Sequence, residues 1–439
     1  MAIATPKIVR SPFDPAIETK VRELLAKMTL AEKLGQMNQL NTGGADLESA
    51  VRAGLVGSVL NVRGAAKVNA LQKIAMEESR LKIPLIAGND VIHGYKTIFP
   101  IPLGEAASWD LERIERAAAV AAKEASAAGT HWTFAPMVDI ARDPRWGRIA
   151  EGAGEDVHLG CAIGRARVRG FQGAALGAPD HVAACVKHFV AYGAAEGGRD
   201  YNTTDMSPRV LEDVYLPPFH AALDAGAATV MSAFNDLNGV PASCHPFTLT
   251  EVLRTRWGFG GFVVSDWNSI GELIAHGAAA DRPEAGKRAL LAGVDMDMTA
   301  EIYPKDLPRL VESGEVPLAA VDEAVRRILR VKFALGLFER PYADPAKESV
   351  LLAPEHLALA REVAARSCVL LKNDRRLPLA KGLKALAVIG PLADNQADLL
   401  GTWSCEGEAK DVVTILEGIK AVSSPTKLLH TKGCEIAGG

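Results

Sequence analysis

The chain has 439 residues, which exceeds one ordinary domain of about 100–200 residues, so we expect one large domain and a smaller one. Apolar residues make up 48% and charged residues 23%, a composition that excludes disordered, collagen-like and coiled-coil proteins. The 49 basic and 53 acidic residues leave a net charge of −4, which argues against nucleic acid or an anionic membrane surface as a partner.

The N-terminal sequence predicts two short helices. Asp14 and Pro15 suit the start of the first, and apolar residues follow from Val21 at helical spacing. Thr29 and Glu32 have the spacing of a capping box for the second. No secretory signal precedes them, and no apolar stretch reaches the roughly 18 residues of a membrane span.

Eight short apolar runs follow, separated by Ala-rich stretches of helical character. They are residues 34–40, 56–62, 84–90, 132–139, 182–189, 228–235, 261–266 and 294–298. Strands that alternate with helices favour a parallel sheet with crossover helices, and eight such units favour an α/β fold of the closed (β/α)₈ barrel type. The alternative is an open doubly wound sheet, but the chain lacks the G-x-G-x-x-G and P-loop motifs typical of it.

After the eighth run, an amphipathic pattern predicts a helix that ends at Gly336, and a Pro-containing polar stretch follows it. We therefore predict a barrel over residues 1–338, a linker over 339–354 and a second α/β unit over 355–439. In this unit we expect a helix over 355–366 and strands over 368–371 and 385–389. Because the chain stops soon after new strands begin, we expect part of an α/β sandwich domain.

The cysteines and acidic clusters give no sign of a metal site or a cofactor. None of the six cysteines forms a C-x-x-C pair, and they are sparse for a disulfide framework. The segment EGAGED, residues 151–156, has no His or Cys to complete a metal site, so we expect it to form a loop and start a helix. The cysteine usage is compatible with a cytoplasmic or a periplasmic protein.

In a (β/α)₈ barrel the active site lies at the carboxyl ends of the strands, so we examined the residues that end or follow each run. They are Asp90, Arg148, Lys187, His188, Met231, Asp266 and Trp267. Carboxylates and cations bind hydroxyl groups in pairs, and indole rings stack on the apolar face of a sugar. This set suits a neutral polyhydroxylated ligand better than a phosphate, which the acids would repel.

Two positions in this set permit sharper predictions. Asp266 ends an apolar strand among cations, where a carboxylate is ionised and firmly held, as a glycosidase nucleophile requires. Position alone equally allows Asp266 to cap a helix that begins near Ser269. Lys187 and His188 are adjacent and would face opposite sides of a regular strand, so shared contact with one ligand requires a distortion there, such as a non-proline cis peptide.

These residues lie in long motifs, namely NDVIHG with TIFPIPLG, WTFAPMVDIARDPRWGRIAEGAGED, VKHFVAYGAAEGGRDYNTTDMSPR and GFVVSDWNSI. The motifs resemble glycoside hydrolase family 3, most of all its bacterial periplasmic β-glucosidases, and the resemblance continues through VLLKNDRRLPL to GTWSCEGEA. It implies a retaining, exo-acting β-glucosidase that cleaves terminal β-D-glucosyl residues from a β-glucoside or oligosaccharide. A periplasmic or extracellular location is implied in the same way.

By motif position, the resemblance implies that Asp266 is the nucleophile. It further implies that the glycone hydroxyls are held by Asp90, Arg148, Lys187 and His188, with Met231 and Trp267 beside them. In a retaining enzyme, a second carboxyl group about 5–5.5 Å from the nucleophile protonates the leaving oxygen and then activates water.

The sequence departs from the family pattern at the general acid/base. Two-domain members use a Glu in the second domain, and this chain ends before that segment is reached. Single-barrel members use a His and an Asp in the loop after KHF, but here the loop AYGAAEGGRDYN has no His, and Glu196 is a weak substitute. We therefore expect a fragment or one piece of a split enzyme, whose activity alone is impaired.

Two alternatives to a glycosidase follow from the residues. One is a non-catalytic sugar-binding barrel that keeps the glycone pocket but has no acid. The other is a barrel lyase or aldolase with Lys187 as its Schiff-base residue, which the adjoining His and the acid-rich rim disfavour. Uncovered strand edges in an incomplete sandwich favour a partner, either a second copy in a homodimer or a complementing C-terminal fragment.

Overall fold

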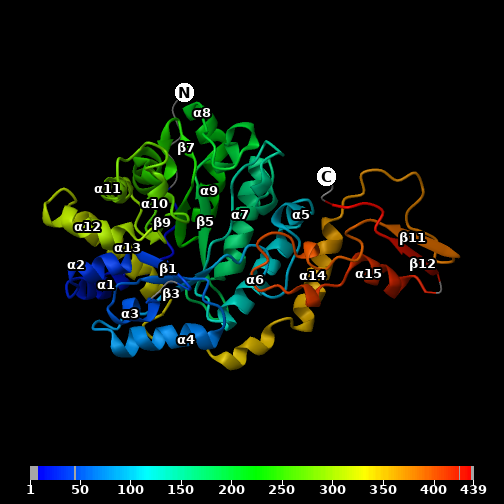
Figure 1. The fold of residues 1–439 in the computed structure, drawn as a ribbon, viewed down its shortest axis with the longest axis horizontal. Coiled ribbons are helices and arrows are strands. Elements are labelled where there is room, and N and C mark those ends of the chain that lie inside the picture. Colours follow the sequence, from blue (N-terminus) through cyan, green and yellow to red (C-terminus); the bar gives the residue numbers. More distant parts are fainter. Residues whose placement is uncertain (1–7, 44–45, 425, 437–439) are drawn as a thin grey trace.

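The computed structural model describes residues 8–43, 46–424 and 426–436. Its main feature is a parallel sheet of eight strands (Figure 1). The strands are β1 (Asn38–Asn41), β2 (Ser58–Leu60), β3 (Ile86–Asn89), β4 (Trp132–Thr133), β5 (Ala183–Phe189), β6 (Thr229–Ser232), β9 (Phe262–Val264) and β10 (Asp297–Met298). They follow the order β10-β1-β2-β3-β4-β5-β6-β9, and a bridge from Val264 to Met296 completes the ring. The predicted (β/α)₈ barrel is confirmed, with one strand overlapping each predicted run.

The strands are shorter than the apolar runs that predicted them. The first run begins inside helix α2 (Leu30–Gln36), and only its end belongs to β1. Thr29 and Glu32 form the predicted capping box of α2, with Thr29 Oγ1 accepting from Glu32 N at 3.3 Å. Asp14 does not cap α1 (Ile17–Leu25) as predicted, because its carboxylate accepts from Ala16 N before the helix begins.

Helices surround the barrel on the outside (Figure 1). Besides α1 and α2 they are α3 (Leu47–Arg52), α4 (Ala65–Lys73), α5 (Pro102–Ala106), α6 (Leu111–Ala127), α7 (Val157–Gln172), α8 (Pro208–Val210), α9 (Pro217–Asp224), α10 (Ser269–Glu272), α11 (Arg282–Ala292), α12 (Ile302–Glu312) and α13 (Leu318–Ala334). Strands β7 (Asp236–Leu237) and β8 (Val240–Pro241) form a small hairpin after β6. Asp156 caps α7 through a bond from Leu159 N at 2.7 Å, which confirms the predicted helix start after EGAGED.

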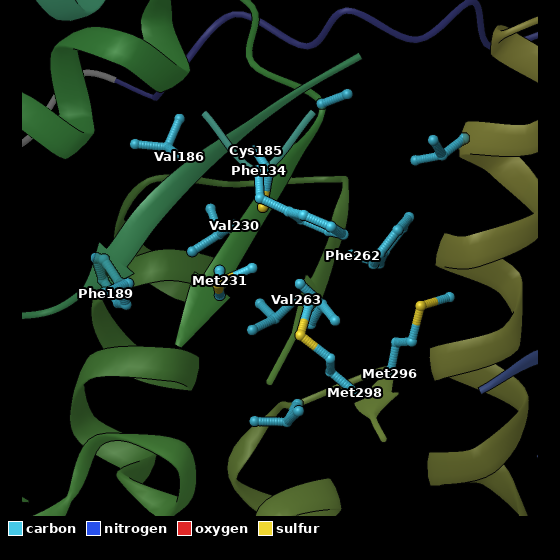
Figure 2. Packing of buried hydrophobic residues seen from close by; sticks show 14 of the residues in the cluster. Phe134, Cys185, Val186, Phe189, Val230, Met231, Phe262, Val263, Met296 and Met298 are labelled. Atoms are coloured by element: carbon cyan, nitrogen blue, oxygen red, sulfur yellow. The ribbon is translucent and has the colours of Figure 1, made fainter. Parts of the chain in front are cut away.

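The inside of the barrel is a packed core. The ring of Trp132 meets those of Phe134 and Phe262 at centroid distances of 4.7 and 5.1 Å, and its indole N–H donates to Thr229 Oγ1 at 2.8 Å. Figure 2 shows Phe134 and Phe262 packed with Met231 and the other apolar side chains of β5, β6 and β9. These buried side chains form a floor beneath the carboxyl ends of the strands.

The second unit is smaller. It contains α14 (Pro354–Ser367), β11 (Ala385–Ile389), α15 (Ile415–Val422) and β12 (Lys427–Thr431), and the two strands pair in parallel. The predicted helix over 355–366 and the strand over 385–389 are confirmed. The strand predicted over 368–371 is wrong: these residues are exposed and have no strand to pair with among the described residues.

The second unit lies beside α5 and α6 of the barrel (Figure 1). A buried carboxylate, Glu124 of α6, joins the two parts. It accepts hydrogen bonds from Thr97 N at 2.8 Å and from Leu352 N at 3.1 Å, and it lies 2.8 Å from Nδ1 of His356 in α14. None of the described helices combines the length and hydrophobicity required to cross a membrane.

Candidate active site

A cavity of about 520 Å³ opens at the carboxyl ends of the barrel strands. All but one of the predicted site residues line it, namely Asp90, Arg148, Lys187, Met231, Asp266 and Trp267. The exception, His188, lies fully buried behind the wall and contacts two of them. The carboxyl ends of the strands therefore bring together side chains from β5 and β6 and from the loops after β3, β4 and β9.

Asp266 follows β9 and faces the cavity with 8% of its surface exposed. Its Oδ1 accepts from Trp267 N at 2.6 Å, and its Oδ2 lies 3.5 Å from His188 Nε2. The side chain does not cap α10, whose N-cap is Asn268. Burial raises the pKa of Asp266 to about 6, although the charges of Lys187 and Arg148 act to lower it.

Lys187 and Asp90 form an ion pair on the cavity wall. Lys187 Nζ donates to Asp90 Oδ1 at 2.9 Å, and the lysine side chain is 3% exposed. Burial disfavours the charged lysine, but the negative charges of Asp90 and Glu151 outweigh burial and raise the pKa of Lys187. The pair therefore presents an ammonium and a carboxylate side by side, an arrangement that matches neighbouring hydroxyl groups of a sugar.

The strand is distorted at Lys187 and His188, as the sequence predicts. The peptide bond between them is cis, the bond between Phe189 and Val190 is also cis, and the register with β6 shifts between Val186 and Phe189. Lys187 points to Asp90, whereas His188 points to Arg148 and Asp266.

His188 belongs to a buried chain of hydrogen bonds. Its Nδ1 and its backbone N each lie 2.9 Å from Asp139 Oδ2, and its Nε2 lies 2.9 Å from Arg148 Nη2. Arg148 in turn donates from Nε to Glu151 Oε1 at 2.6 Å and from Nη2 to Glu151 Oε2 at 3.2 Å. Burial lowers the pKa of His188 well below its ordinary value, so the neutral ring donates from Nδ1 to Asp139 and accepts from Arg148.

Sequence reasoning did not identify Asp139 and Glu151 as parts of the site. Both are about 2% exposed. Asp139 ends the fourth apolar run just as Asp90 ends the third, so its position at a strand end could have identified it as a site residue. Glu151 was assigned to a loop with the rest of EGAGED, but it lies three residues after Arg148 on the short 3₁₀ helix η2 (Gly147–Glu151), where the two side chains meet.

The second unit also contributes to the cavity wall. The cavity is also lined by Trp403, Ser404 and Cys405, and the ring centroid of Trp403 lies 5.6 Å from Lys187 Nζ. Trp403 and Trp267 are 44% and 45% exposed, so both rings stand at the mouth rather than at the buried end. Glu196, weighed as a substitute acid, is exposed and does not line this cavity.

Among the described residues, Asp90 and Asp266 are the carboxylates that line the cavity, and Asp90 is already bonded to Lys187. The same part of the chain holds no group of three or more His, Cys, Asp or Glu side chains arranged for a metal ion. The arrangement supplies one carboxylate aimed into a polar cavity and cations beside it. It can bind the hydroxyls of a sugar and present a nucleophile to a carbon that carries a leaving group.

Residues 29–331 match the N-terminal domain of glycosyl hydrolase family 3, and residues 368–430 match its C-terminal domain. The periplasmic beta-glucosidase of Salmonella typhimurium is 46% identical over 97% of this chain and 57% of its own length. The lysosomal beta glucosidase of Dictyostelium discoideum is 34% identical over 97% of this chain and 58% of its own length.

Among solved structures, the beta-glucosidase of Listeria innocua in complex with isofagomine superposes with a TM-score of 0.90. It is 42% identical, and the match covers 95% of this chain and 60% of that one. The chain thus spans less than two thirds of the length of each of these relatives.

Proposed function

The chain belongs to glycosyl hydrolase family 3, and on this premise we propose that it carries the nucleophile half of a retaining, exo-acting β-glucosidase. The observation that carries the proposal is the buried Asp266 carboxylate, aimed into a cavity whose wall presents Asp90, Lys187 and Arg148. Relatives named beta-glucosidases share the fold and most of the length of this chain, and Listeria innocua structures hold glucose and isofagomine. The substrate class that fits is a β-D-glucoside or a β-linked oligosaccharide.

We assign roles by position in the cavity. The hydroxyls of the terminal glucose are bound at the buried end by Asp90, Lys187 and Arg148. His188 lies behind the cavity wall and contacts Arg148 and Asp266, so it orients both side chains. Met231 contacts the sugar from the floor. Trp267 stands at the mouth, where the leaving group lies.

The proposed reaction has two displacements. Asp266 attacks the anomeric carbon, the bond to the leaving oxygen breaks, and that oxygen takes up a proton as a glycosyl-enzyme forms. Water then attacks the same carbon and loses a proton to solvent, the ester bond breaks to regenerate the Asp266 carboxylate, and glucose leaves with its configuration retained. Because Asp90 is bonded to Lys187, we propose that the proton for the leaving oxygen comes from a group other than the carboxylates that line this cavity.

The proposal is tested with 2-deoxy-2-fluoro-β-D-glucosyl fluoride, a reagent that needs a nucleophile but little help from an acid. We expect intact-protein mass spectrometry to show one added fluoroglucosyl group, and peptide mapping to place it on Asp266. A folded chain that binds glucose but gains no adduct would instead support a non-catalytic sugar-binding barrel.

The rate of this labelling should fall in acid, with a midpoint near pH 6. Burial raises the pKa of Asp266 to about 6, so its nucleophilic carboxylate form is lost at a higher pH than for an ordinary Asp. The labelling rate measured from pH 4 to 8 tests this. In Asp90→Asn the midpoint should move to lower pH, because the charge of Asp90 contributes to raising the pKa of Asp266. An unchanged midpoint in this variant would contradict the assignment.

Glu151→Gln should lower the labelling rate by about 10- to 100-fold, the equivalent of losing hydrogen bonds to a charged group. Glu151 holds Arg148 through two bonds, and without its charge the guanidinium is free to turn away from His188. Asp143→Asn is the matched control, since it breaks an exposed Asp–Arg pair in the same loop. A folded Glu151→Gln protein that labels like the control would show that Arg148 needs no such support.

We further propose a periplasmic or extracellular location, because the Salmonella relative is a periplasmic beta-glucosidase. The limits of the domains at residues 338 and 355 stay predictions. A homodimer or a complementing C-terminal fragment is likewise proposed on the sequence argument alone, and sedimentation of the purified chain would test it.

A further inference from the structure

Residues 401–408 of the second unit lie tightly against residues 92–101, the barrel loop that follows Asp90. Glu406 N donates to the carbonyl oxygen of Tyr95 at 2.8 Å, and the carboxylate of Glu406 accepts from Arg63 Nη1 at 2.7 Å. Lys96 forms an ion pair with Glu408. A Cβ at Gly407 would lie 2.6 Å from Ile98, so the two segments touch too closely there for a side chain. This docking places Trp403 at the cavity.

His93 is at the centre of this contact. The ring is 3% exposed, with Nδ1 2.7 Å from the carbonyl oxygen of Phe99 and Nε2 2.6 Å from the carbonyl oxygen of Thr402. The first bond is made within the barrel loop and the second reaches the second unit. Carbonyl oxygens only accept hydrogen bonds, so a neutral ring donates to one of them and an imidazolium donates to both.

The backbone beyond Thr402 needs such an anchor. Trp403 and Cys405 have φ values of 55° and 45°, in the left-handed region that residues other than glycine rarely adopt. Such conformations persist when the surrounding structure holds them in place. Here the holding contacts flank the two residues: His93 binds the carbonyl before Trp403, and Tyr95 binds the amide after Cys405.

We infer that His93 is a positioning residue for the leaving group: by binding the Thr402 carbonyl it fixes the Trp403 ring at the cavity mouth, next to Lys187. The inference rests on the proposed function, which places the leaving group at the cavity mouth, where the Trp403 ring can stack on it. His93 itself does not line the cavity. Substrates with a large leaving group should therefore depend on His93, and substrates with a small one should not.

The kinetic experiment compares 4-nitrophenyl β-glucoside with β-glucosyl fluoride, which has no ring to stack. His93→Phe should lower kcat/KM for the aryl glucoside more than it lowers kcat/KM for the fluoride, by a factor on the order of ten, which is typical of one or two hydrogen bonds. His93→Gln keeps a hydrogen-bond donor and should restore most of the kcat/KM for the aryl glucoside. In a Trp403→Ala background, His93→Phe should add less than about a twofold effect, since the two residues act as one unit. Equal losses on both substrates, or additive losses, would overturn the inference.

A second measurement does not depend on turnover. Backbone hydrogen exchange of residues 402–406 should be faster in His93→Phe than in the original protein by on the order of tenfold, because local opening becomes easier. Lys96→Met is the matched control: it removes the ion pair with Glu408 in the same interface but leaves the Thr402 carbonyl bound. Unchanged exchange in His93→Phe overturns the inference, whether or not the chain hydrolyses glucosides. Faster exchange in a chain that the fluorosugar fails to label would instead place the failure with the proposed function.

Discussion

Asp266→Gly is expected to lower the turnover of an activated aryl glucoside by about 10⁴-fold or more, a loss typical of removing the central group of a catalytic unit. Among the described residues that line the cavity, Asp266 is the carboxylate without an ion pair to a lysine, and its Oδ2 lies 3.5 Å from His188 Nε2. The other carboxylate there, Asp90, is held by Lys187, so we expect Asp266 to form the glycosyl ester. Initial rates with 2,4-dinitrophenyl β-glucoside measure the loss.

The same variant offers a stereochemical test. Azide is small enough to occupy the space of the missing carboxylate, and attack from that side inverts the anomeric carbon. We expect azide to restore part of the rate and the product to be α-glucosyl azide, identified by NMR. Glu272→Gln is the matched control, since Glu272 lies six residues further on and does not line the cavity. A β-configured azide product, or a control as inactive as Asp266→Gly, would refute the assignment.

The second large effect concerns the leaving group. The described wall of the cavity holds no carboxyl group free to protonate the leaving oxygen, because Asp90 is bonded to Lys187 and Asp266 is the nucleophile. General acid catalysis contributes about 10²- to 10⁴-fold, so this chain should cleave glucosides of poor leaving groups slower by about that factor than activated ones. A series of aryl β-glucosides gives the dependence of kcat/KM on the pKa of the leaving phenol, which we expect to be steep.

The same series of glucosides measured on Asp90→Asn shows whether Asp90 protonates the leaving group. If Asp90 supplied the proton despite its bond to Lys187, Asp90→Asn would steepen the dependence further. We expect Asp90→Asn to lower all rates through weaker sugar binding and to leave the slope unchanged. A shallow slope in the original chain would show that it contains an effective acid and would contradict the prediction.

The barrel and most of its site could be predicted because both follow from local patterns. Each apolar run overlaps one strand, and parallel strands end at a common edge, so Asp90, Lys187 and Asp266 meet although more than 170 residues separate the first from the last. The distortion at Lys187 and His188 was predictable because two adjacent strand residues cannot otherwise serve one site.

One missed residue, Trp403, depends on a contact between distant segments. Trp403 reaches the cavity because the second unit docks on the loop after β3, and no spacing within the sequence indicates that contact. The apolar run at 368–371 resembles a strand locally, but a strand exists only where a neighbour completes its hydrogen bonds. The first residues of the run at 34–40 are helical because they continue helix α2, which the capping box at Thr29 begins.

The packed floor of the barrel also decides the route of water. Because Trp132, Phe134 and Phe262 close the cavity from below, the water required by the proposed second displacement would have to enter through the mouth, after the first product has left. In the proposed reaction, an alcohol that rests against Trp267 and Trp403 at the mouth would lie on the route of that water. Such an alcohol would compete with water as the acceptor of the glucosyl group, so a cavity with its floor closed favours transfer to an alcohol as the reaction that competes with hydrolysis.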